Sequence, residues 1–64
     1  MKLYSLLTKH DDPCKYYQIY AKGAKFLYSG IANNIPWYIA KRIIYSHWED
    51  ESGCTWVLLK GEEK

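Results

Sequence analysis

Hydrophobic and polar positions alternate most clearly over residues 15–22, KYYQIYAK. One side of this segment carries Tyr17, Ile19 and Ala21, and the other carries Tyr16, Gln18, Tyr20 and Lys22. Strict alternation predicts a β-strand with one buried face. Gly23-Ala24 then predicts a two-residue type II′ turn into a second strand, KFLYSG. This turn would pair Lys22 with Lys25 and place Phe26 and Tyr28 on the core face.

Three further segments complete a predicted sheet. Residues 2–8, KLYSLLT, alternate imperfectly and predict a first strand, which ends at the turn sequence Asp11-Asp12-Pro13. Residues 43–49 and 54–60 are rich in β-branched and aromatic side chains and predict a second hairpin. The DESG sequence between them suits a type I turn. Either face of this hairpin could be the buried one, since both carry large apolar side chains.

A short helix is predicted over residues 35–42. Asn33 or Asn34 can serve as its N-cap, and Pro36 suits its first turn. Its apolar stripe would be Ile35, Ile39 and Ile43. The expected order is therefore β-β-β-α-β-β: a single small α+β domain, residues 1–64, with an antiparallel sheet of four or five strands and one short helix.

Aromatic residues make up 17% of the 64-residue chain, more than one small core can bury. The side chains expected at the surface are Tyr16, Tyr20, Trp37, Tyr38 and either Trp48 or Trp56. Tyrosine, tryptophan and arginine dominate protein interfaces. The predicted partner-binding residues are Tyr16, Tyr20, Trp37, Tyr38, Lys41 and Arg42. The alternative is that loops and the first strand cover both faces of the sheet.

The hydropathy pattern favours a cytoplasmic protein without a membrane partner, and the net charge of +2 neither requires nor excludes a nucleic-acid partner. Residues 1–10 lack the apolar stretch of a secretory signal, and no apolar run approaches the length of a membrane span. In a reducing cytosol, Cys14 and Cys54 are expected to be free thiols.

The sequence contains only weak signals for catalysis or metal binding. His10, Asp12, Cys14, His47 and Cys54 are zinc-ligand types, but their spacing does not match structural zinc sites. Cys54, His47 and Glu49 supply the residue types of nucleophilic catalysis. A chain this short has little room for a substrate pocket. We therefore expect no enzyme activity, no metal and no cofactor.

The run LYSG followed by NNIPWYIAKRIIYS, within residues 15–48, resembles small accessory proteins of phages and prophages. The resemblance is carried by Gly30, Ile35, Pro36 and the strand from Ile43. It implies a short protein that binds and blocks a larger host protein, and it assigns no functional residue.

These observations predict a non-catalytic protein-binding module, with an inhibitor of a host protein and a homodimer as its expected forms. The less favoured alternative is a single-stranded nucleic-acid binder. Its platform would be a sheet face with Tyr16, Tyr20, Lys22 and Lys25.

Overall fold

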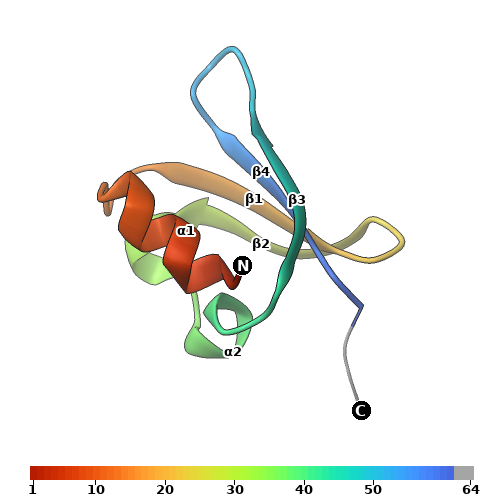
Figure 1. The fold of residues 1–64 in the computed structure, drawn as a ribbon. Helices are drawn as coiled ribbons and strands as arrows, with labels where there is room; N and C mark the ends of the chain where they lie inside the picture. The colour runs from red at the N-terminus through yellow and green to blue at the C-terminus, as the bar shows by residue number, and fades with distance from the viewer. Residues whose placement is uncertain (62–64) are drawn as a thin grey trace.

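The computed structural model describes residues 1–61, which form a four-stranded sheet and two short helices (Figure 1). The elements in chain order are α1 (Leu3–His10), β1 (Tyr16–Ala21), β2 (Lys25–Ile31), the 3-10 turn Ala32–Asn34, α2 (Trp37–Ala40), β3 (Ile44–Glu49) and β4 (Thr55–Leu59). The predicted small α+β class is confirmed. The predicted order of elements is wrong, because the chain begins with a helix.

The sheet is mixed rather than antiparallel. Its strand order is β2-β1-β4-β3, and each outer pair is an antiparallel hairpin. The two hairpins join through β1 and β4, which run parallel, with Tyr17 beside Thr55 and Ile19 beside Val57. The all-antiparallel prediction was wrong at this pair, which joins segments some 40 positions apart that no turn sequence connects.

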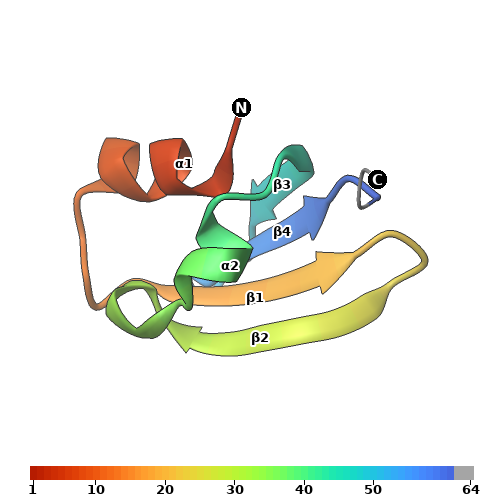
Figure 2. The same cartoon turned by 90° about the horizontal axis from the view of Figure 1, so that it is seen from below.

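Both helices lie on one face of the sheet (Figure 2). The core between the two layers contains Leu3, Leu6, Tyr17, Ile19, Ile39, Ile44, Val57 and Leu59. Inward residues of β1 and β4 alternate strictly with outward ones. No helix among residues 1–61 covers the opposite face, which we call the outer face.

Residues 2–8 form most of α1 and not the predicted first strand. Leu3, Leu6 and Leu7 recur at helical spacing, and Leu3 and Leu6 are fully buried against the sheet. The helix ends at Asp11, whose left-handed conformation closes the last turn with a hydrogen bond to the Leu7 carbonyl. Only Lys2 keeps strand-like pairing, as a single bridge to Ile43.

A helix is present within the predicted range 35–42, but it is shorter than predicted and spans Trp37–Ala40. Pro36 stands at the N-cap, and Asn33 and Asn34 belong to the preceding 3-10 turn, so neither asparagine caps α2. Lys41 is the C-cap, and Arg42 lies beyond the helix. The expected stripe stops at Ile39, because Ile43 is outside the helix and exposed.

The β1–β2 hairpin has a three-residue turn rather than the predicted two-residue one. Ala21 pairs with Lys25 and Tyr20 with Phe26, and a bulge then restores the expected pairing of Ile19 with Tyr28. The left-handed conformations of Gly23 and Ala24 form the turn. Phe26 therefore lies on the outer face, 55% exposed, and its predicted place in the core was wrong.

An irregularity after Ile44 decides which face of the β3–β4 hairpin is buried. Ile44 pairs with Leu59, but Ser46 pairs with Leu58, so Tyr45 is an extra residue that shifts the alternation. Ile44, Val57 and Leu59 consequently face the core, while Trp48 pairs with Trp56. Glu49 pairs with Thr55.

Gly30 is expected to tolerate no side chain. Its φ is +153°, and a Cβ there would lie 2.7 Å from the Tyr28 hydroxyl, which donates a hydrogen bond to the Ile31 carbonyl. We expect Gly30→Ala to lower the free energy of unfolding by about 1–3 kcal/mol in chemical denaturation, from strain and overpacking. The loss should shrink in a Tyr28→Phe background. An equal loss in both backgrounds would show that the Tyr28 contact is not its cause.

Candidate protein-binding face

Five aromatic side chains occupy the outer face of the sheet. They project from all four strands and define the aromatic face: Tyr16 and Tyr20 of β1, Phe26 of β2, Trp48 of β3 and Trp56 of β4. Tyr16, Phe26 and Trp48 are 48%, 55% and 51% exposed, and Tyr20 and Trp56 are half-buried. Alternation forces them outward, since Tyr17, Ile19 and Val57 face the core.

The centre of the aromatic face is internally packed. The Tyr20 ring stacks on the Trp56 ring across the parallel pair, with centroids 5.9 Å apart and planes 11° apart. Phe26 meets Tyr20 edge to face at 5.6 Å. Such pairs add about 0.5–1.5 kcal/mol beyond the area they bury. The face is therefore an ordered surface and not a set of freely rotating side chains.

Asp50 fixes one end of this surface. Its Oδ2 accepts a hydrogen bond from the Trp56 indole Nε1 at 2.9 Å. Its Oδ1 accepts from the backbone of Ser52 and Cys54 and from the Ser52 hydroxyl, which holds the β3–β4 turn. These hydrogen bonds, with that from Trp56 the largest cause, lower the pKa of Asp50 to about 2.

The lowered pKa of Asp50 predicts an acid-sensitive stability. The ordinary value is 3.8, so between about pH 4 and pH 2 the unfolded chain binds more protons than the folded one. The contribution of Asp50 is present above about pH 4 and is lost as the pH falls through this range. We expect the melting temperature to fall less steeply over this range in Asp50→Asn. Identical pH profiles for both proteins would contradict this role of the carboxylate.

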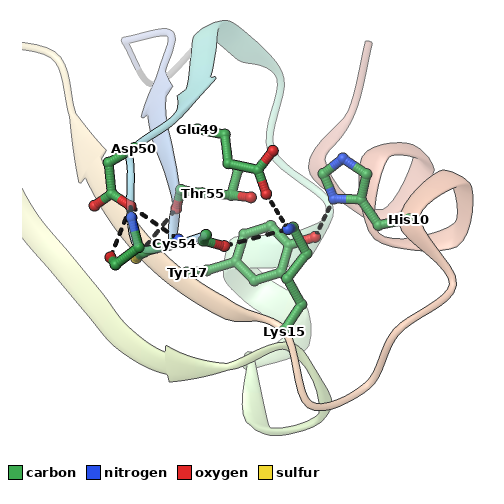
Figure 3. A network of polar contacts seen from close by, with 9 residues as sticks. His10, Lys15, Tyr17, Glu49, Asp50, Cys54 and Thr55 are labelled. Carbon is green, nitrogen blue, oxygen red and sulfur yellow. Dashed lines mark hydrogen bonds and ion pairs between the residues drawn. The ribbon is translucent and has the colours of Figure 1, made fainter.

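A second polar network lies on the core side of the sheet (Figure 3). The buried Tyr17 hydroxyl and the Nδ1 of His10 share a hydrogen bond of 2.6 Å. Burial raises the pKa of Tyr17 to about 12 and lowers the pKa of His10, so both groups are neutral near pH 7. Beside them Lys15 forms an ion pair with Glu49 and bonds the Gly53 carbonyl. The network ties α1 and the β3–β4 hairpin to the start of β1.

The residues considered for catalysis and metal binding do not form a site in the described structure. Cys14 and Cys54 are both free, and burial raises the pKa of the Cys54 thiol, which opposes formation of the nucleophilic thiolate. His10 is engaged with Tyr17. Within residues 1–61, no group of three His, Cys, Asp or Glu side chains could hold a metal ion.

The six predicted partner-binding residues fall into two groups. Tyr16 and Tyr20 lie on the aromatic face. The other four lie in or just after α2, on the helix-covered side of the sheet: Trp37, Tyr38, Lys41 and Arg42. The Trp37 ring stacks on Tyr4 of α1, with centroids 5.5 Å apart, yet Trp37 is still 64% exposed. No single surface contains all six.

Two exposed members of the aromatic face were not predicted as site residues. Phe26 was assigned to the core because the turn was taken to be one residue shorter. Trp48 and Trp56 were expected on opposite faces, and the irregularity at Tyr45 places them together. No signal for either bulge is evident in the local sequence. The DESG sequence did predict the β3–β4 turn that the Asp50 carboxylate holds.

Comparison with protein-family models, with curated proteins and with solved structures gives no significant match. No helix formed by the described residues is long and apolar enough to cross a membrane.

Proposed function

We propose that this protein is a non-catalytic protein-binding module whose contact surface is the aromatic face. One observation carries the proposal: the outer face, which no helix of residues 1–61 covers, presents three exposed aromatic side chains around a stacked pair. Aromatic residues in a fixed arrangement provide large contact area at low cost in side-chain entropy. A partner protein, or a second copy, would bury this face.

The geometry favours protein binding over base stacking on this face. A nucleic-acid base needs the flat side of a ring, and Tyr20 and Trp56 turn their flat sides toward each other. The ionised Asp50 carboxylate lies on the Trp56 edge, between Glu49 and Glu51 in the sequence, where it would repel phosphate. Lys22 lies in the turn of the β1–β2 hairpin, and Lys25 pairs with Ala21 of the core face.

The resemblance to accessory proteins of phages and prophages agrees with a small protein that modulates a larger host protein. We therefore include in the proposal that the partner is a larger host protein and that binding inhibits it. A chain of 64 residues could act in this way by covering a functional surface of its partner. The outer face is the broad surface that such a contact would use.

The testing experiment compares immobilised variants as baits in lysate. Phe26→Ala shortens an exposed aromatic side chain on the aromatic face, and Trp37→Ala does so on the helix side. Light scattering of the free protein would separately reveal self-association. The proposal predicts that the wild-type and Trp37→Ala baits bind a partner protein or a second copy. The Phe26→Ala bait should not retain it. Equal binding by all three baits would contradict it.

A further inference from the structure

A basic cavity opens where three distant segments of the chain meet. About 430 Å³ in volume, it is lined by Lys2, Tyr38, Lys41, Arg42, Ile43, Lys60 and Gly61. Four of these seven residues are cationic at neutral pH. No carboxylate among residues 1–61 lines the cavity, and none of its four cations forms an ion pair with a described residue.

Backbone hydrogen bonds build this cavity. The Leu3 N–H donates to the Arg42 carbonyl at 2.9 Å, and the Ile44 N–H donates to the Met1 carbonyl at 2.8 Å. The Lys60 N–H donates to the Ile43 carbonyl at 2.9 Å. The start of α1, the α2–β3 connection and the end of β4 are thereby held together, so the four cationic side chains start from fixed backbone positions.

A second cavity extends the basic surface. It has a volume of about 600 Å³ and shares Lys60 and Gly61 with the first. Lys22 adds a fifth cation, and no described carboxylate lines it either. One strongly exposed tyrosine stands at each cavity, Tyr38 at the first and Tyr45 at the second, 67% and 68% exposed.

The described carboxylates lie elsewhere, in the α1–β1 connection and at the β3–β4 hairpin: Asp11, Asp12, Glu49, Asp50 and Glu51. The β3–β4 turn precedes β4 and Lys60 directly follows this strand, so the turn and Lys60 lie at opposite ends of β4. Within residues 1–61, the five cavity cations therefore lie apart from the carboxylates. Such a distribution orients an approaching polyanion toward the basic end.

We propose that the two cavities together form a binding site for the phosphate backbone of single-stranded nucleic acid. Five cations spread over adjoining cavities fit an extended chain of phosphates better than one isolated anion. The Arg42 guanidinium offers paired donors to phosphate oxygens, and the lysines act as point charges. Tyr38 and Tyr45 supply flat rings for stacking unpaired bases. None of the five residues of the aromatic face lines either cavity.

The test is fluorescence anisotropy of a labelled oligothymidylate of about 12 nucleotides, within the span of single-strand binding sites. The full chain is used, so any competition from Glu62 and Glu63, which follow Gly61 in the sequence, is included. Lys41→Gln/Lys60→Gln removes two charges from the cavities, and Lys9→Gln/Lys25→Gln removes two charges elsewhere. Arg42 is kept because its Nη2 also donates to the Lys60 carbonyl.

Loss of two phosphate contacts should lower the salt slope by about 1.4 and weaken binding on the order of 25-fold at 0.1 M salt. Tyr38→Ala should weaken it about tenfold. The matched control pair and Trp48→Ala should bind nearly as wild type, which separates this site from the aromatic face. Thermal unfolding of each variant checks that these exposed substitutions leave the fold intact.

The proposal is overturned if wild type does not bind the oligonucleotide, or if the control pair loses as much affinity as the cavity pair. Loss of binding in Trp48→Ala would overturn it by placing the nucleic acid on the aromatic face. Equal affinity for a polyglutamate peptide of the same charge would assign the site to acidic proteins. Equal affinity for a duplex of the same length would show that unpaired bases are not recognised, which contradicts a single-strand site.

Discussion

Tyr17→Ala is expected to remove a large part of the free energy of unfolding at 25 °C. Tyr17 is fully buried at the centre of the sheet, and truncating a large buried aromatic side chain costs about 3–5 kcal/mol. The substitution also removes the hydroxyl that partners His10. A domain of 64 residues has a total stability of roughly 3–10 kcal/mol. Far-ultraviolet circular dichroism through a urea titration would measure the loss.

Two neighbouring changes serve as controls for this prediction. Tyr17→Phe keeps the ring and loses one hydrogen bond, so it should cost about 1 kcal/mol. Tyr16→Ala changes the adjacent residue on the outer face and should change stability by about 0.5 kcal/mol or less. If Tyr16→Ala were as damaging as Tyr17→Ala, the assignment of the two faces of β1 would be incorrect.

Trp48→Ala is expected to weaken binding of the partner protein about 30-fold or more. An aromatic anchor at an interface contributes about 2 kcal/mol or more, and 1.4 kcal/mol corresponds to a factor of ten in Kd. Its effect on stability should be about 1 kcal/mol or less, since Trp48 is half-exposed and lies opposite Trp56 on the neighbouring strand. Calorimetric titration of wild type and of Trp48→Ala with the captured partner would give the two Kd values to compare.

Trp37→Ala is the matched control for Trp48→Ala, because it removes the same exposed side chain from the other side of the molecule. Its Kd should stay within a few-fold of the wild-type value, which corresponds to a change in binding free energy of less than about 1 kcal/mol. A large loss of affinity in Trp37→Ala with none in Trp48→Ala would move the interface to α2 and the two residues after Ala40, where four of the six predicted residues lie.

The sequence predicted the local features of the sheet well. Alternation in β1 correctly assigned Tyr17, Ile19 and Ala21 to the core, because a period of two needs no knowledge of the partner strand. Both hairpins were found from their turn residues. Glycine and aspartate have conformational and hydrogen-bonding roles that depend only on the nearest residues.

The first segment was misread because two patterns overlap in it. Leu3, Leu6 and Leu7 fit a helical stripe, while Leu3, Ser5 and Leu7 also fit one side of a strand. Eight residues are too few for either period to dominate, so packing decides the outcome. The buried Leu3 and Leu6 show that the helix was selected by the core it covers.

The aromatic face could be predicted only in part, because its composition depends on two irregularities. The bulge near Leu27 moves Phe26 outward, and the one at Tyr45 places Trp48 beside Trp56. A one-residue shift exchanges the two faces of a strand, and no turn residue signals these shifts. The parallel contact of β1 with β4 adds the Tyr20–Trp56 stack, which needs the whole topology to be known.

Oxidative footprinting of the protein alone and with its captured partner would test the aromatic face most directly. Hydroxyl radicals modify exposed aromatic rings, and both sides of this molecule carry such rings. We predict that the partner protects Tyr16, Phe26 and Trp48 while Trp37 and Tyr38 remain as reactive as in the free protein. Protection of Trp37 and Tyr38 with unchanged reactivity of Phe26 and Trp48 would contradict the proposal.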